Sequence, residues 1–249
     1  MTRAARLLAG VLLAVVLAGC GGTKVVTTTT TTPAPKVTQV KVYFLAHDKL
    51  QPISRFVSTS EPAWLGAWKD LIVGPTAADP LAASTALRLP ENESWTLGRT
   101  NSDLLSLSTV ALPRVFLAQT VYTLTQFAPK QPVIVNGLRY TRADFEDETP
   151  AILVESPLPE AHISRPLRVT GTANTFEATF EYELVDSAGK VIAKHFVTAT
   201  SGSGTRGTFD FTVEYPAGHR GPGKLVVYES SAKDGSRIHA VEIPLRLAG

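Results

Sequence analysis

The chain has 249 residues, of which 44% are hydrophobic, and it carries 24 Lys and Arg residues against 22 Asp and Glu residues. The small positive excess vanishes once Arg3 and Arg6 are set aside, so no basic surface for nucleic acid or anionic lipid is expected. The single cysteine excludes a disulfide within the chain, so the folded part must be held together by packing.

The first residues have the pattern of a secretory signal. Arg3 and Arg6 precede an apolar run at residues 7–17, and small residues lead from that run to Cys20. The run is shorter than the roughly 20 apolar residues that a helix needs to span a bilayer. We therefore interpret residues 1–19 as a signal peptide that is removed from the mature protein.

The sequence Leu-Ala-Gly-Cys at residues 17–20 resembles the lipobox of bacterial lipoproteins. The resemblance implies that the chain is cut before Cys20 and that acyl chains on this residue anchor it to the outer face of the cytoplasmic membrane. Residues 20–36 contain six consecutive threonines and a Pro-Ala-Pro, which predicts a disordered or extended tether. This tether is either a bare spacer or O-glycosylated, and the sequence leaves both open.

Residues 37–148 are predicted to form an α+β domain, because apolar residues recur there with both strand and helix periods. Proline and glycine mark the helix ends, and Asn136-Gly137 favours a hairpin turn. The expected elements are a strand at 40–45, a helix from Glu61-Pro62 to Gly74-Pro75, short strands at 86–90, 95–98 and 104–110, a helix from Leu112 to Pro129, and a strand at 132–135.

Residues 149–249 are predicted to form an all-β sandwich without a convincing helix. Apolar and polar residues alternate at 176–184, 209–215 and 239–245, and each stretch predicts a strand with one dry and one wet face. Turn residues separate these stretches at short intervals. About seven strands over about 95 residues favour a sandwich of two sheets.

Both segments resemble known families, and together the likenesses cover nearly all of the expected folded chain. Residues 40–148 resemble the GerMN (sporulation and spore germination) domain, and residues 151–247 resemble the immunoglobulin-like domain of bacterial spore germination. The resemblance implies an assembly or interaction role, and neither family supplies a catalytic residue. The matching pieces are V-K-V-Y-F-L at 40–45, L-I-V-G-P at 71–75, Y-T-L-T-Q-F at 122–127 and V-I-V-N-G at 133–137, then I-L-V-E-S-P at 152–157, V-T-G-T-A at 169–173, L-V-D-S-A-G-K-V at 184–191, G-T-F-D-F-T-V at 207–213 and E-S-S-A-K-D-G-S at 229–236.

The residues offer no pattern for nucleophilic or metal chemistry, so neither an enzyme nor a cofactor is expected. The sequence has no Gly-x-Ser-x-Gly, and its five histidines never have the spacing of a zinc site. His195 and His239 are expected to be hydrogen-bonded within strands. His47, His162 and His219 are expected to be solvated in loops.

Two further segments have a structural and a functional interpretation. The acidic residues 144–148 form either a solvated linker between the domains or a calcium site, although they lack an ordered calcium-loop pattern. The segment Ser201–Gly207 could bind an anion through backbone N–H groups, but it leads into a predicted strand and not a helix. We therefore favour a linker and a flexible sandwich loop.

The tryptophans are the candidate ligand contacts. Trp64 and Trp68 lie four residues apart on the apolar face of the first helix and are expected in the core. Trp95 has polar neighbours and is the best candidate for stacking on a sugar.

Two functions are compatible with the sequence. The first is a membrane-anchored envelope lipoprotein, without enzymatic activity, that binds other envelope proteins or assembles with itself in sporulation, spore germination or envelope signalling. The second is a lipoprotein that binds peptidoglycan or wall polysaccharide through Trp95. The candidate site residues are therefore Cys20 for lipidation and Trp95 for ligand contact.

Overall fold

A long hairpin opens the part of the chain that the computed structural model describes, which comprises residues 36–76, 79, 94–100 and 104–249. Strands β1 (Val37–Ala46) and β2 (Lys49–Ser58) pair antiparallel across a turn at His47 and Asp48, both of which have positive φ. β1 confirms the strand predicted at 40–45. β2 was not predicted, because its polar residues and its proline obscure the alternation.

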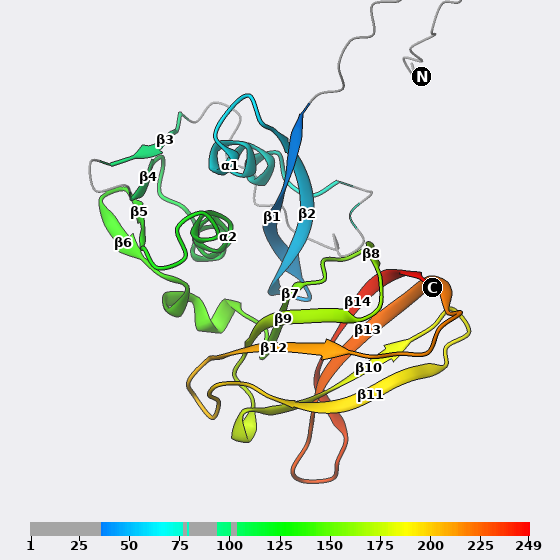
Figure 1. Ribbon diagram of the computed structural model, residues 1–249. Helices are drawn as coiled ribbons and strands as arrows, with labels where there is room; N and C mark the ends of the chain where they lie inside the picture. Colours follow the sequence, from blue (N-terminus) through cyan, green and yellow to red (C-terminus); the bar gives the residue numbers. More distant parts are fainter. Residues whose placement is uncertain (1–35, 77–78, 80–93, 101–103) are drawn as a thin grey trace, which may run out of the picture. The chain divides into compact units, whose positions relative to one another are not determined.

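The first half of the described chain combines this hairpin with two helices and a second sheet (Figure 1). Helix α1 (Ala63–Val73) begins after Pro62 and ends at Gly74, as predicted, and α2 (Arg114–Thr125) begins after Pro113. The four-stranded sheet has the order β3-β4-β5-β6, and Asn136-Gly137 forms the predicted hairpin turn with φ values of 51° and 82°. Its strands are β3 (Thr96–Arg99), β4 (Leu105–Ser108), β5 (Val133–Val135) and β6 (Leu138–Tyr140). The strand predicted at 86–90 lies outside the described residues.

Helix α2 covers the outer edge of β1 with side chains in place of a neighbouring strand. The Thr123 hydroxyl accepts the Tyr43 N–H at 3.1 Å, and the Gln119 amide donates to the Tyr43 carbonyl at 3.1 Å. The Gln126 amide bonds both the N–H and the carbonyl of Lys41, at 2.9 and 2.6 Å. These three helix residues lie on one face, so the buried edge of β1 keeps its hydrogen bonds.

The second half folds into a sandwich of a five-stranded sheet, in the order β11-β10-β13-β14-β8, and a three-stranded sheet, in the order β12-β9-β7. In Figure 1 the two sheets form separate layers, and Phe180 meets Phe209 between them with ring centroids 4.9 Å apart. The sandwich prediction is confirmed, with eight strands instead of about seven. They are β7 (Ile152–Ser156), β8 (Ala161–Ile163), β9 (Leu167–Ala173), β10 (Thr179–Val185), β11 (Val191–Thr198), β12 (Gly207–Val213), β13 (Arg220–Ser230) and β14 (Arg237–Ala248).

Two local predictions need correction. The strand expected to begin at Phe176 begins at Thr179, because residues 176–178 form a short 3₁₀ turn (η2) with positive φ at Glu177 and Ala178. The prediction of a solvated linker at residues 144–148 also needs correction. These residues form part of the 3₁₀ helix η1 (Arg142–Glu148), in which Phe145 is buried. A buried aromatic residue ties this segment to the first core and makes it part of the fold.

Strand β7 contributes to both hydrophobic cores. Ile152 and Val154 point into the sandwich core, whereas Leu153, between them, belongs to the core of the first half. Successive side chains of a strand point to opposite faces, so one strand serves both. Residues Pro35–Gly249 accordingly form one compact unit. Within the described ranges, no helix is long and apolar enough to cross a membrane.

Candidate functional site: the outer face of the five-stranded sheet

The candidate site lies on the face of the five-stranded sheet that points away from the sandwich core. Strand β10 buries every second side chain in the core and turns Glu181 and Glu183 to the outer face. The strand register places Tyr228 of β13 opposite Glu181 and Lys194 of β11 opposite Glu183. Residues opposite each other in antiparallel strands share a face, so these four side chains meet.

A tyrosine lies at the centre of this arrangement. The Tyr228 hydroxyl is 3.1 Å from a carboxylate oxygen of Glu181 and 3.1 Å from one of Glu183. Lys194 reaches the same two carboxylates at 3.2 and 3.3 Å. The Arg237 guanidinium lies 4.4 Å from the centre of the Tyr228 ring and donates to Glu183 at 2.6 Å. We call these five residues the outer-face cluster.

The contacts within the outer-face cluster favour the charged forms of its two glutamates and its lysine. Burial alone would raise the pKa of Glu183, but hydrogen bonds from Tyr228, Lys194 and Arg237 hold it below its usual value. The Ser230 hydroxyl and Lys194 lower the pKa of Glu181. Hydrogen bonds to Tyr228 and the two glutamates raise the pKa of Lys194. Two carboxylates therefore face two cations at neutral pH, and their charges balance.

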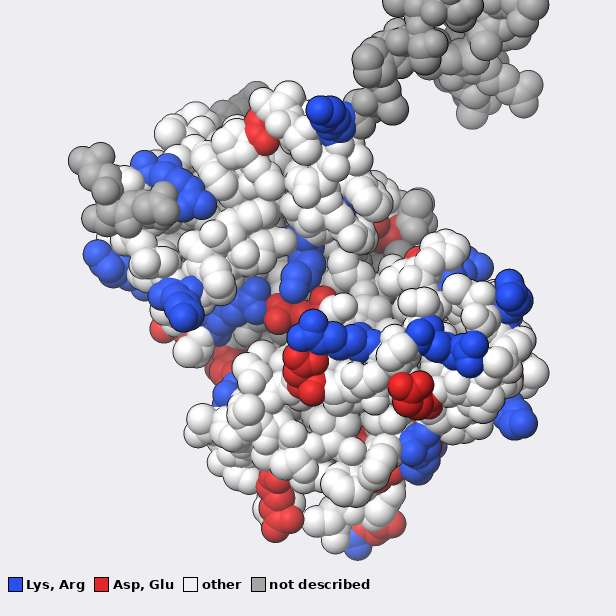
Figure 2. Space-filling view, viewed as in Figure 1, with Lys and Arg blue, Asp and Glu red and all other residues white. Residues whose placement is uncertain are grey.

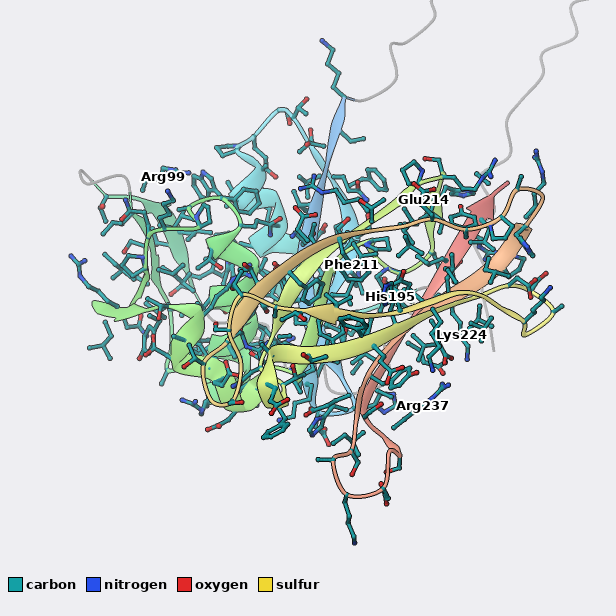
Figure 3. The ribbon with its side chains drawn as sticks, turned by 60° about the horizontal axis from the view of Figure 1, so that its bottom comes forward. Arg99, His195, Phe211, Glu214, Lys224 and Arg237 are labelled. Carbon is teal, nitrogen blue, oxygen red and sulfur yellow. The ribbon has the colours of Figure 1, made fainter. Side chains whose placement is uncertain are left out.

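The rim of the cluster is apolar and exposed. Phe196 of β11 pairs with Glu181 and keeps 61% of its surface exposed. β11 and β12 are terminal strands of their respective sheets. Figure 3 shows His195 on β11 and Phe211 on β12. In Figure 2 basic and acidic side chains lie next to one another over the sandwich. The outer-face cluster itself pairs two carboxylates with two cations beside the exposed ring of Phe196.

This arrangement suits protein recognition. Tyrosine and arginine dominate the binding energy of many interfaces, and charge pairs that are already formed reduce the entropy lost on binding. Within the residues that the structure describes, no group of three or more His, Cys, Asp or Glu side chains could hold a metal ion.

A second ionic cluster fixes β7 against the first half of the chain. Arg142 lies over the rings of Tyr43 and Tyr122, 5.5 and 4.6 Å from their centres, and bonds Glu155 at 2.7 Å. Burial would raise the pKa of Glu155, but Arg142 and Lys41 lower it. Burial and the Glu155 charge raise the pKa of Tyr43, which donates its hydroxyl to Glu155. These groups are ion pairs and hydrogen bonds of the fold.

Two hollows flank β7 and β14. One, of about 520 Å³, lies between the β1–β2 turn and β13–β14 and is lined by His47, Lys49, Lys224 and Val241 among others. The other, of about 470 Å³, lies beside Lys41 and has a mixed polar and apolar lining. Both are open to solvent.

The structure describes one of the two predicted site residues. Cys20 lies outside the described residues. Trp95 is half-buried and packs edge-on against Trp68, with ring centroids 5.9 Å apart. Trp68 is fully buried and Trp64 partly so, as predicted for core residues. Part of the Trp95 surface thus serves the core, and its contact with a ligand stays a prediction.

The histidines lie mostly where the sequence placed them. His195 and His239 lie in strands and are hydrogen-bonded, His195 to the Phe196 N–H at 2.8 Å and His239 to Glu229 at 2.9 Å. The prediction of a loop for His162 is wrong, because it lies in β8. His219 is bonded to Asp186 at 3.0 Å.

The acidic segment and the glycine-rich loop have structural partners. The Asp144 carboxylate accepts the N–H and the hydroxyl of Thr141, the N-cap residue of η1. Glu146 forms a double ion pair with Arg206, and Glu148 pairs with Arg114. These carboxylates point to different partners. In the loop, the Ser203 N–H donates to the Thr175 carbonyl and the Gly204 N–H to the Asn174 side chain, both at 2.9 Å. These N–H groups are therefore not free to bind an anion.

Sequence reasoning missed the outer-face cluster. The alternation at 176–184 placed Glu181 and Glu183 on a wet face, yet Glu183 is only 4% exposed. Tyr228 and Arg237 cover it from strands more than 40 residues away in the sequence. Two glutamates two residues apart in a strand were the available signal, and the register of the sheet supplied their partners.

Comparison with known proteins identifies the second half. The model of the family described as the immunoglobulin-like domain of bacterial spore germination matches residues 151–236. This match does not test the GerMN resemblance of residues 37–148. The search of curated proteins finds no match to the chain. Residues 151–236, which form most of the sandwich, thus match the immunoglobulin-like domain of bacterial spore germination.

Proposed function

We propose that this protein is a lipid-anchored envelope protein without enzymatic activity, which binds other envelope proteins in spore germination, sporulation or envelope signalling. The family match to residues 151–236 supports the germination context. The lipobox at residues 17–20 supports the anchor on the outer face of the membrane. Each support is independent of the other.

The outer-face cluster is the observation that carries the binding role. Arg237 keeps 51% of its side chain exposed while its guanidinium is held by Glu183 and the Tyr228 ring. An arginine that is oriented before binding loses little side-chain entropy when a partner arrives. The exposed ring of Phe196 beside it adds apolar surface.

The tether would concentrate this surface near the membrane. Residues 20–36, if extended, reach roughly 50 Å at about 3.1 Å per residue. Attachment to the same membrane raises the effective concentration of the domain for other envelope proteins. Weak contacts therefore suffice.

The test is crosslinking in cells of the tagged full chain, followed by mass spectrometry. We expect a small reproducible set of envelope proteins, and Arg237→Ala should reduce their recovery about tenfold, as loss of about 1.4 kcal/mol would. Arg168→Ala is the matched control, because Arg168 is an exposed arginine on the other sheet, paired with Asp210.

Two results would contradict this function. Equal recovery of envelope proteins with the Arg237→Ala and unmodified chains would show that the outer-face cluster takes no part in partner binding. Recovery of wall fragments alone, released by muramidase and lost on Trp95→Ala, would establish the glycan-binding alternative instead.

A further inference from the structure

Strand β11 has an open edge with little of the usual protection. It is the terminal strand of the five-stranded sheet and runs for eight residues without a proline. Edge strands are normally shortened, kinked, covered or charged along the edge, because their free backbone groups pair with other strands. Here Val191 and Phe196 remain 43% and 61% exposed.

One hydrogen bond shows which backbone groups face this edge. The Phe196 N–H donates to the ring nitrogen of its neighbour His195 at 2.8 Å and not to β10. In an antiparallel strand the N–H and carbonyl of one residue point to the same side, and successive residues alternate. Lys194, Phe196 and Thr198 therefore present their backbone groups to the open edge, with a side chain covering one of them.

We propose that β11 pairs antiparallel with β11 of a second copy of this chain, about a two-fold axis through His195. The two five-stranded sheets then join into one continuous sheet across the dimer. This inference depends on the proposed membrane anchor in one respect only, which is the high local concentration that the anchor provides for pairing.

The position of the axis follows from the faces of the strand. Opposite residues in an antiparallel pair share a face. A two-fold axis perpendicular to the sheet must therefore pass midway between the two copies of one residue, and we name the axis by that residue. An axis at Lys194 would bring two lysines together, and an axis at Phe196 would shorten the overlap to residues 194–198. The axis at His195 pairs residues 192–198 in full, and Lys194 and Phe196, whose backbone groups face the edge, bond across it.

The order of side chains along this edge favours a second copy as the occupant. With the axis at His195, Lys194 lies opposite Phe196 of the second copy, which pairs with Glu181 of its own β10. Each Lys194 then pairs with Glu183 on β10 of its own copy. Glu181 of the other copy lies on the far side of the Phe196 ring. Across the interface the side chains follow in the order Glu183 and Lys194 of one copy, then Phe196 and Glu181 of the other. The two-fold axis repeats this order in the opposite direction, so the edge complements itself.

One strand pair makes a small interface. Stable complexes usually bury more than about 1,200 Å², so the dimer should be weak in dilute solution. Anchoring both copies in one membrane raises their effective concentration to roughly millimolar, where a weak pair forms.

Cysteine crosslinking tests the register directly. Cys20 is the chain's single cysteine, and His195→Cys adds a thiol at the proposed axis. Opposite residues without mutual hydrogen bonds are about 4.5 Å apart between Cα atoms, which a disulfide spans. We expect His195→Cys in the full chain to give a disulfide dimer in membranes. Thr212→Cys, on the exposed side of β12 at the end of the other sheet, should stay monomeric.

A pair of phenylalanine variants tests the contact. In the His195→Cys chain, Phe196→Lys should lower the dimer yield at least tenfold, because the proposed register places the new lysine opposite Lys194 of the second copy, and like charges directly opposite each other are destabilising. Phe176→Lys is the control, since Phe176 is 62% exposed but lies outside β11. No dimer from His195→Cys, equal yields from Thr212→Cys, equal losses from the two lysine variants, or crosslinking only to a different protein would each overturn the proposal.

Failure of the anchor gives a different result. The full chain carrying both Cys20→Ala and His195→Cys should be monomeric when dilute and should form the disulfide dimer when purified and concentrated. That dimer, found together with full membrane retention of Cys20→Ala, would refute the lipid anchor and leave the β11 pairing intact. A monomer at every concentration would refute the pairing itself.

Discussion

Arg142 shows how single residues hold the two halves of the compact unit together. Its guanidinium lies over two tyrosine rings, and it neutralises Glu155 on β7. Only 28% of its side chain and 16% of the Glu155 side chain are exposed. A charge that is buried to this extent depends on its partner, because desolvation is costly without it.

The first residue-scale prediction concerns this pair. Arg142→Leu should lower the free energy of unfolding by about 3 kcal/mol, since it leaves the Glu155 carboxylate without its main partner. Urea denaturation followed by circular dichroism measures the change. Arg168→Leu, which removes an exposed arginine paired with Asp210, should leave the midpoint nearly unchanged. Equal effects of the two variants would show that Arg142 has no special structural role.

The second residue-scale prediction concerns pH. The folded-state pKa values of Glu155 and Glu146 lie below the ordinary value of 4.5, because Arg142 and Arg206 outweigh the effect of burial. Their contribution to stability is therefore complete above pH 4.5 and is lost as the pH falls through the lower folded-state values. Urea midpoints should fall steeply below pH 4.5. Glu155→Gln should flatten that slope, and an unchanged slope would contradict the assignment.

At the scale of elements, α2 supplies the hydrogen-bond partners that a neighbouring strand would supply at the edge of β1. Gln119, Thr123 and Gln126 bond the backbone of β1, which would otherwise bury unpaired groups. We therefore expect these polar residues to be intolerant of apolar replacement, although they lie on a largely buried helix. The periodicity of the sequence identified the helix, but its apolar face alone did not reveal this role.

The prediction at this scale uses two buried threonines of α2. Thr123→Val keeps the shape but leaves the Tyr43 N–H without an acceptor, and it should cost about 1–3 kcal/mol. Thr120→Val should cost less, because the Thr120 hydroxyl only donates to the Phe116 carbonyl in the preceding turn. Thermal unfolding of both variants compares them. A larger loss for Thr120→Val would contradict the edge-covering role.

At the scale of the whole molecule, the proposed function joins an anchor, a tether and a compact unit. The compact unit spans residues Pro35–Gly249, and β7 ties its two halves through both cores. Partner binding on the outer face therefore requires no movement between the halves.

The corresponding prediction is membrane retention through Cys20. Cys20→Ala should release the protein from the membrane fraction, because the thiol that carries the acyl chains is lost. Its near-ultraviolet circular dichroism should match that of the unmodified chain, which shows intact packing. Fractionation that leaves the Cys20→Ala protein in the membrane would refute the lipid anchor.

Local pattern determined much of this protein. Proline and glycine placed both ends of α1, Asn136-Gly137 placed a hairpin, and alternation placed three of the eight sandwich strands, β10, β12 and β14, although β10 begins at Thr179 and not at Phe176. These signals act over a few residues, so the sequence carries them directly. The resemblance of residues 151–247 to the immunoglobulin-like domain of bacterial spore germination came from longer stretches of matching sequence, and the family model matches residues 151–236.

Only the tertiary structure decided which distant residues meet. The register of β10 against β11 and β13 brought Tyr228 and Lys194 to Glu181 and Glu183, and the return of β14 added Arg237. Strand pairing depends on contacts across the whole sandwich, and a shift of one residue would turn every side chain to the other face. For that reason the sequence determined the strands and their faces, and the assembled sheet determined the site.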